Sequence, residues 1–282
     1  MKIFLFVSLL LILSACQSEV PISTPTPTQT PPEATQTPTP THVPTSTITP
    51  TLEPSQTPTP VFEVCSPLED ETFSSLLEIL YTTLDIPPNF GDDTGHHGVD
   101  FAYYQRGERM SMQGVEIYAI MAGKTVLTLE DDWPYGHTIL IETPLDDLPE
   151  SLKDHLMENY LPVPEDPHYR LTCPKVNLPV VTGEYAVYHL YAHMEAQPEF
   201  KRGDQIACGE TLGTVGNTGY SSAPHLHLET RLGPAGAHFT TMAHYGNSDT
   251  PKQRGNYCLW RMSGYYQLFD PFILFDAVES IP

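Results

Sequence analysis

Two histidines that stand two residues apart, His225 and His227, have the clearest potential for chemistry in this chain. They alternate with Leu226 and Leu228, a pattern typical of a β-strand with one packed face. Residues i and i+2 of a strand share a face, so we expect both imidazoles and the Glu229 carboxylate on the same side. Taken alone, the pattern favours a half-exposed strand that carries two surface histidines.

Two further histidine clusters change this interpretation. His96 and Asp100 stand four residues apart, with Gly98 between them to let the backbone turn, and His193 lies in another alternating, strand-like segment. Imidazole nitrogen and carboxylate oxygen are ordinary zinc ligands. His96, Asp100 and His227 would supply three ligands and leave one position for water, which is typical of a catalytic zinc site.

Three motifs, in this order, resemble those of the lysostaphin-type zinc metallopeptidases. Residues 95–100 match the motif His-x-Gly-x-Asp, and residues 191–194 resemble the segment Tyr-Ala-His-Leu. Residues 213–219 followed by 225–229 resemble the glycine-rich approach to the strand His-Leu-His-Phe-Glu. The resemblance covers about residues 92–229. It implies a mainly β fold, the duplicated hybrid motif, with a compact antiparallel two-sheet core, short helices and an inserted loop.

The resemblance also implies a role for five residues and one zinc ion per chain. The metal ligands of the family fall on His96, Asp100 and His227. Its two other catalytic residues, which are not ligands, fall on His193 and His225.

Four further positions receive no chemical role. His97 stands at a variable position of the motif and is expected to be a surface or supporting imidazole. Ala223 replaces a family glycine before the His-x-His pair, so the local loop shape is expected to differ. His155 and His168 are interpreted as non-ligands.

The implied activity is zinc-dependent hydrolysis of peptide bonds, with peptidoglycan cross-links or stems as the substrate. Zinc would lower the pKa of a bound water towards ~7 and polarise a peptide carbonyl. One of His193 and His225 would accept the proton of the water, and the other would donate a hydrogen bond to the oxyanion. We favour His225 as the base because it adjoins a ligand on the same strand.

Two alternatives remain open. The first is a non-catalytic lipoprotein that binds peptidoglycan or activates a partner hydrolase, although relatives of that kind have usually lost ligands. The second is a zinc peptidase that acts on proteins or peptides outside the cell wall.

The first sixty residues are expected to export and anchor the protein. Residues 1–15 have a short charged start, an apolar run and small residues, as in a signal peptide, and residues 13–16 resemble a lipobox. Cys16 would then carry a lipid and hold the protein outside the cytoplasm at the membrane; the alternative is a plain secretory signal. Residues 16–60 are rich in Thr and Pro, which predicts an extended spacer without a folded core.

Residues 61–282 are long enough for one folded domain. The whole chain has 35 acidic and 13 basic residues, a net charge of -22. This balance argues against nucleic acid as a partner, because phosphate binding uses clustered Lys and Arg. The sequence does not indicate an oligomeric state.

Besides Cys16, four cysteines are present: Cys65, Cys173, Cys208 and Cys258. An even number in an exported domain predicts two disulfides, and the connectivity is open among three possibilities. A bridge between Cys65 and Cys258 would tie the ends of the domain together, and we take that pairing as a working hypothesis.

The secondary structure is expected to consist of short strands with glycine turns. An amphipathic helix is expected over 72–84. The expected strands are 115–120, 124–129, 138–142, 183–194 and 209–215. Residues 144–182 are an insertion with a short helix around Leu152, and we expect it to lie beside the groove and restrict the substrate. No chemistry is assigned to residues 233–282.

Overall fold

The structure is a computed structural model that describes residues 62–165, 168–175 and 178–279. The expected signal peptide, the lipidated Cys16 and the Thr/Pro-rich linker lie outside these residues. Within the described part, no helix has the length and apolar character needed to cross a bilayer.

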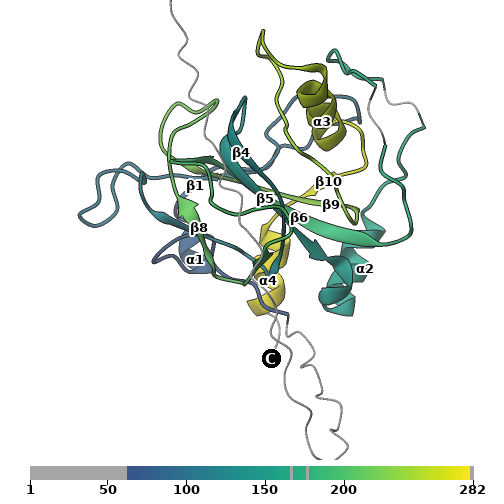
Figure 1. Cartoon of the computed structure of the whole chain (residues 1–282). Helices are drawn as coiled ribbons and strands as arrows, with labels where there is room; N and C mark the ends of the chain where they lie inside the picture. Colours follow the sequence, from purple (N-terminus) through teal and green to yellow (C-terminus); the bar gives the residue numbers. More distant parts are fainter. Residues whose placement is uncertain (1–61, 166–167, 176–177, 280–282) are drawn as a thin grey trace, which may run out of the picture. The chain divides into compact units, whose positions relative to one another are not determined.

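The fold is organised around one antiparallel sheet (Figure 1). Its strands follow the order β1 (Leu80–Thr82), β2 (Val99–Phe101), β9 (Leu226–Pro234), β6 (Tyr185–Met194), β5 (Gly136–Pro144), β4 (Gly123–Asp132) and β7 (Gln205–Ile206). A further strand, β10 (Gln267–Phe269), also pairs with β9, and a separate two-stranded sheet joins β3 (Glu116–Tyr118) to β8 (Thr211–Thr214). The predicted mainly β fold with two antiparallel sheets and short helices is confirmed, and each expected strand coincides with an observed one.

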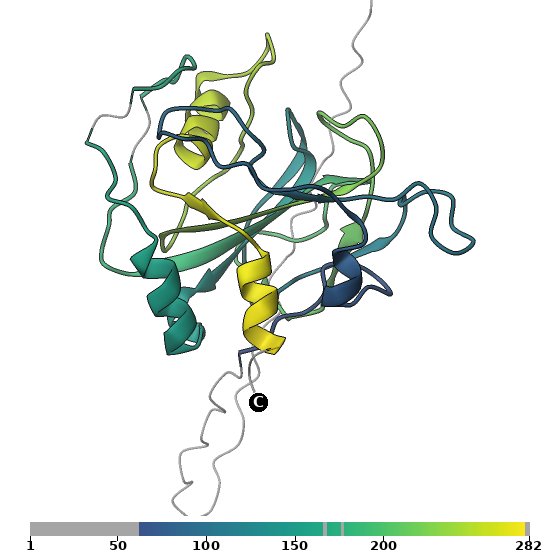
Figure 2. The same cartoon turned by 180° about the vertical axis from the view of Figure 1, so that it is seen from behind.

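Helices cover both faces of the large sheet, as Figures 1 and 2 show. On one face lie α1 (Phe73–Leu76), α2 (Glu150–Glu158) and α4 (Phe272–Glu279), and a short 3-10 helix, η1 (Leu145–Asp147), precedes α2; on the other face lies α3 (Pro251–Arg261). Strand β6 is buried along nearly all of its length, and its alternate residues enter two separate hydrophobic clusters. A strand that packs on both faces has a nearly continuous apolar sequence.

The helix expected over 72–84 is wrong beyond its first turn. α1 ends at Leu76, and the chain then forms β1, in which Leu80 pairs with Phe101 of β2. Leu80 and Leu84 still pack against the core, while Leu77 is 60% exposed. Pairing with the strand that carries Asp100 therefore overrides the local helical periodicity. The helix expected in the insertion is confirmed as α2.

The two predicted disulfides are present, but the expected pairing of Cys65 with Cys258 is wrong. Cys65 is bonded to Cys208, and Cys173 is bonded to Cys258. Cys65 and Cys208 both lie beside Ile120, whose carbonyl accepts a hydrogen bond from the Cys65 backbone N–H at 2.9 Å. The second bridge instead joins the insertion to α3.

A buried histidine in β6 makes stability dependent on pH. His189 is fully buried, its Nδ1 lies 2.8 Å from the Tyr191 hydroxyl, and its Nε2 lies 3.0 Å from Thr143 Oγ1. Burial lowers the pKa of His189 to about 3. As the pH falls below ~6.5, His189 therefore binds a proton in the unfolded chain but not in the folded chain. The folded state keeps its full free-energy advantage from the neutral His189 above that pH and loses it progressively below it.

We expect this group to remove about 2 kcal/mol of unfolding free energy between pH 7 and pH 5. Urea unfolding of the wild type and of His189→Gln at both pH values would measure it. The variant should lose less stability on acidification by that amount, and an equal pH dependence of the two proteins would contradict the assignment.

Candidate metal centre

Strand pairing brings the two halves of the predicted ligand set together. β2 and β9 are antiparallel neighbours, and Asp100 stands directly opposite His227. His96 precedes β2 and is held by a backbone pairing with Asp85. The three side chains that were predicted as ligands therefore meet where β2 pairs with β9. One ligand atom of each lies within 4.8 Å of the others.

The Asp100 carboxylate is the centre of this group. Its Oδ1 lies 3.1 Å from His96 Nε2 and 2.8 Å from His227 Nδ1. Burial alone would raise the pKa of Asp100, but hydrogen bonds from His227 and His96 outweigh it and lower the pKa. Asp100 is therefore an anion at neutral pH, as a metal ligand must be.

The remaining ring nitrogens of the two histidines are also engaged. His96 Nδ1 lies 3.1 Å from the Thr83 carbonyl oxygen, and His227 Nε2 lies 3.3 Å from Glu229 Oε1. Both acceptors fix the tautomer so that the other nitrogen, His96 Nε2 or His227 Nδ1, can bind a metal. Burial lowers the pKa of His227, but hydrogen bonds to Asp100 and Glu229 raise it to about 9.

Gly98 has a different role from the turn expected for it. A Cβ at Gly98 would lie 2.6 Å from the Leu228 carbonyl oxygen and 2.9 Å from the His227 ring. The left-handed turn occurs instead at Gly95, with φ of 81°. Gly98 thus allows the motif to approach β9 closely enough for His96 and His227 to share one carboxylate.

The two other predicted histidines lie next to the ligand group. The ring centroids of His193 and His225 are 4.7 Å apart, and His225 Nε2 is 3.6 Å from Asp100 Oδ1. His193 Nδ1 donates to the Thr218 carbonyl at 2.8 Å, and His225 Nδ1 donates to the Ala223 carbonyl at 2.8 Å. Because a carbonyl only accepts, Nε2 of each neutral ring carries a lone pair. His225 directly precedes β9, so the expected strand begins one residue later than its first histidine.

Burial keeps these two rings neutral. It lowers the pKa of His193 to about 3, with further contributions from His227 and His225, and it lowers the pKa of His225. Neutral imidazoles with a free lone pair are proton acceptors at neutral pH.

All five residues line one cavity of about 820 Å³. Its rim is aromatic, with five half-exposed or exposed side chains: Tyr81, Tyr104, Trp133, Tyr220 and Tyr245. No described residue of the insertion at 144–182 lines it. The expectation that the insertion lies beside the groove and restricts the substrate stays a prediction.

The donor set fits zinc. Two imidazole nitrogens and one carboxylate oxygen converge, each imidazole is oriented by a second acceptor, and all three residues line the cavity. Three protein ligands beside an open position are typical of catalytic zinc.

One known family matches part of this chain. Residues 176–239 match the family described as Peptidase family M23. We call residues 176–239 the M23 segment. The M23 segment contains His193, His225 and His227, while His96 and Asp100 precede it. Peptidases of family M23 are typically zinc-dependent.

Solved structures similar to this chain include two peptidase-related catalytic domains. The catalytic domain of the antimicrobial peptidase lysostaphin from Staphylococcus simulans is 18% identical, with 73% of this chain and 98% of that chain covered and a TM-score of 0.37. A variant catalytic domain of the prophage-encoded M23 protein EnpA from Enterococcus faecalis is 18% identical, with 56% and 82% covered and a TM-score of 0.32.

A zinc-containing peptidase from Vibrio cholerae is 16% identical, with 60% of this chain and 33% of that chain covered and a TM-score of 0.28. The comparison with curated proteins found no match.

Beneath the M23 segment's ligand lies a polar layer that the sequence analysis missed. The fully buried Glu229 accepts hydrogen bonds from the Tyr135 hydroxyl at 2.8 Å, from Arg231 Nε at 2.9 Å and from Trp260 Nε1 at 3.0 Å. Burial would raise the pKa of Glu229, but Arg231 and the contact with His227 hold it well below its usual range. The sequence did contain a signal for this layer: Glu229 and Arg231 stand two residues apart on one strand. Buried charges are usually paired, so a buried strand that carries both indicates an ion pair.

Two residues without an assigned role can now be placed. His97 is buried and accepts a hydrogen bond from Arg231 Nη2 at 3.0 Å, so it supports the layer beneath the site rather than the surface. Burial lowers the pKa of His97 to about 2. Ala223 contributes its carbonyl to His225 and has no positive φ, so the replacement of glycine is accommodated without strain.

Proposed function

We propose that this chain is a zinc-dependent metalloendopeptidase that hydrolyses peptide bonds, most directly those in peptidoglycan cross-links or stems. The observation that carries the proposal is the convergence of five side chains in one open cavity: His96, Asp100, His227, His193 and His225. The match of the surrounding segment to family M23 supports the same activity.

His96 Nε2, Asp100 Oδ1 and His227 Nδ1 would hold the zinc ion. When bound, zinc supplies a Lewis acid that polarises the scissile carbonyl and makes water more acidic. Glu229 accepts from the far nitrogen of His227, which keeps that ring in the tautomer and orientation needed for binding.

The proton of the attacking water passes to a histidine. His225 is the base in our proposal, because its Nε2 carries a lone pair and lies 3.6 Å from the ligand Asp100. The water oxygen forms the new bond to the carbonyl carbon, and its proton moves to His225 Nε2. The same proton then moves to the amine when the C–N bond breaks.

His193 orients the water in this proposal. Its Nδ1–H is committed to Thr218, so its Nε2 is an acceptor and cannot donate to an oxyanion in the neutral ring. Because burial lowers its pKa to about 3, a protonated His193 is costly. This assignment replaces the oxyanion role that the sequence analysis left to the second histidine.

The cavity supports a peptide substrate. Its volume of about 820 Å³ accommodates several residues of an extended chain, and its aromatic rim offers planar apolar surface beside the ligand group. The two alternatives are a peptidase that acts outside the cell wall and a non-catalytic binding protein. Five intact positions around one carboxylate favour catalysis over the latter.

The proposed cellular arrangement is based on the sequence. Residues 1–15 would be a signal peptide, Cys16 would carry the lipid anchor and residues 16–60 would be the linker. Residues 61–282, with an insertion at 144–182, would form the peptidase domain at the outer side of the membrane.

Digestion of purified peptidoglycan tests the activity. The chain should release new amino termini, which dinitrophenylation and mass spectrometry would identify. A chelator should abolish the release and added zinc should restore it. Zinc-loaded, folded protein that releases no amino termini from peptidoglycan would reject the proposed substrate, and cleavage that survives removal of zinc would reject the mechanism.

A further inference from the structure

One part of the insertion contacts the segment that precedes the first metal motif. We define the strap as residues 168–173, and it rests on the loop that leads into the first metal motif. The Arg170 backbone N–H donates to the Gly91 carbonyl at 2.8 Å, and its guanidinium lies 3.1 Å from an Asp92 carboxylate oxygen. A Cβ at Gly91 would lie 2.2 Å from the His168 carbonyl oxygen, so the two backbones are in close contact.

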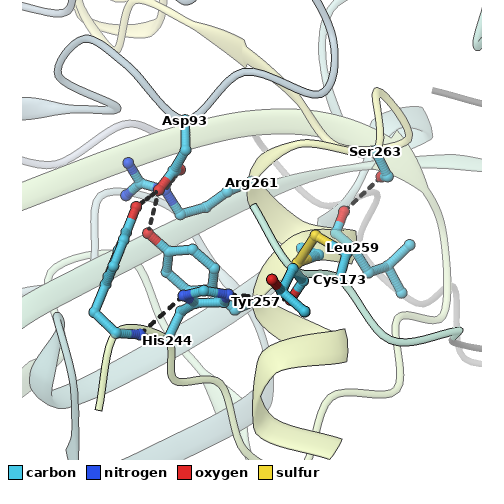
Figure 3. The surroundings of a disulfide bond; sticks show 10 residues. Asp93, Cys173, His244, Tyr257, Leu259, Arg261 and Ser263 are labelled. Atoms are coloured by element: carbon cyan, nitrogen blue, oxygen red, sulfur yellow. Dashed lines mark hydrogen bonds and ion pairs between the residues drawn. A yellow bond between two sulfur atoms is a disulfide. The ribbon is translucent and has the colours of Figure 1, made fainter. Parts of the chain in front are cut away.

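The strap is also joined to α3. Cys173 is bonded to Cys258, and the preceding Thr172 carbonyl lies 3.3 Å from His244 Nε2. Figure 3 shows this disulfide beside α3, with His244 and Tyr257 on the same side of the helix as Arg261. The strap therefore contacts the 91–93 loop directly and reaches α3 through a covalent bond.

Arg261, at the end of α3, faces back to the same loop. Its Nε donates to Asp93 Oδ1 at 2.6 Å, and the Asp93 carboxylate also accepts from Tyr257 at 2.9 Å and from Tyr245 (Figure 3). The side chain of Asp93 is 6% exposed and that of Arg261 is 11% exposed, so solvent screens this ion pair only weakly. Asp93 stands three residues before His96.

The same guanidinium reaches the support of the other ligand. Arg261 Nη1 lies 3.7 Å from Glu229 Oε1 and 3.3 Å from the Tyr135 hydroxyl, which itself donates to Glu229. Glu229 Oε1 is the acceptor beside His227 Nε2. One cation thus contacts both the segment that carries His96 and the carboxylate that orients His227.

We propose that Arg261 is a positioning residue for the metal centre, held in place by the strap through the Cys173–Cys258 disulfide. It contacts neither the ligand nitrogens nor the cavity's reacting groups directly, and it acts through Asp93 and Glu229. The proposal rests on the proposed zinc function. It assigns a role to α3, which lies outside the M23 segment, and to the insertion, which lines no part of the cavity in the described residues.

Zinc affinity of the full-length chain, measured by competition with a chromophoric chelator, tests the first part. Arg261→Gln and Glu229→Gln should each weaken zinc binding about 10- to 100-fold, as expected for groups that orient a ligand. In the double variant the added loss over Glu229→Gln alone should be smaller than the loss in Arg261→Gln alone, because the part of the effect of Arg261 that passes through Glu229 is already lost. Lys252→Gln, which removes an exposed cation from the same helix, is the matched control and should bind as the wild type does.

If Arg261 only stabilised the fold, Arg261→Gln would lower the melting temperature, and its effect on zinc affinity would not depend on Glu229. Wild-type affinity in a folded Arg261→Gln protein, or losses that multiply in the double variant, would overturn the proposal. If Arg261→Gln does not fold, Arg261→Lys replaces it in the same set of single and double variants. Lysine keeps the positive charge but lacks the planar guanidinium that donates several hydrogen bonds. Failure of the wild type to bind zinc would instead reject the proposed function.

The two disulfides provide the test of the strap. Cys173→Ala with Cys258→Ala should weaken zinc binding about tenfold or more, because the strap and α3 are no longer joined. Cys65→Ala with Cys208→Ala removes the other bridge, which contacts none of these residues, and should leave affinity unchanged. Equal affinities in the two double variants would overturn the part assigned to the strap.

Discussion

Replacing His227 with alanine is expected to abolish both zinc binding and hydrolysis. The substitution removes one of three ligands, so we expect zinc content to fall from about one ion per chain to below ~0.1 after dialysis. Zinc as a Lewis acid stabilises the transition state by several kcal/mol. Because each ~1.4 kcal/mol of the barrier changes the rate tenfold, its loss should lower peptidase activity by about 10³-fold or more. Elemental analysis and a peptide-cleavage assay would measure the two effects.

The His227→Ala chain should remain folded, because Glu229 keeps its contacts with Tyr135, Arg231 and Trp260. Near-UV circular dichroism would check this. His155→Ala removes an exposed histidine of α2 and is the matched control, with wild-type zinc content and activity. A folded His227→Ala protein that retains one zinc ion would show that the ligand set is wrong.

Replacing His225 or His193 with alanine is expected to lower turnover while zinc stays bound. Loss of the base His225 should reduce kcat by about 10²- to 10⁴-fold. Loss of His193 should give a smaller decrease, because in our proposal it orients the water and does not remove its proton. Stopped assays at saturating substrate, with zinc measured on the same samples, would separate the two contributions.

The two variants also differ in how they respond to pH. The acidic limb of the kcat profile, which reports the base, should disappear in His225→Ala and persist in His193→Ala. The opposite pattern would exchange the two roles. Loss of zinc from His193→Ala would mean that His193 is a ligand, which its hydrogen bond to Thr218 and its position outside the ligand group argue against.

Short motifs in the sequence predicted which side chains the structure brings together in the candidate site. His225 and His227 stand two residues apart, so strand spacing suggested a shared face, while the roles of the five residues came from the resemblance to the lysostaphin-type motifs. The segments of β6 and β9 that carry His193 and His227 were recognisable because their histidines alternate with apolar residues, whereas β2, which carries Asp100, was not predicted. The assignment of metal and base stays a prediction for the zinc and turnover measurements to test.

Features that the sequence could not provide depend on contacts between distant segments. The support of His227 by Glu229 involves Tyr135, about ninety residues earlier, and Trp260, about thirty residues later. The helix expected over 72–84 failed because pairing with β2 is a tertiary interaction that local periodicity does not contain. The pairing of Cys173 with Cys258 likewise depends on the packing of the insertion against α3, so cysteine spacing gave no indication of it.

The most direct test of the central claim is the anomalous diffraction of crystals of the zinc-loaded protein, measured on both sides of the zinc absorption edge. We expect a single anomalous peak bonded to His96 Nε2, an Asp100 carboxylate oxygen and His227 Nδ1, with the fourth position facing the cavity. A peak on other residues, or none in a folded protein soaked with zinc, would contradict the proposed metal centre.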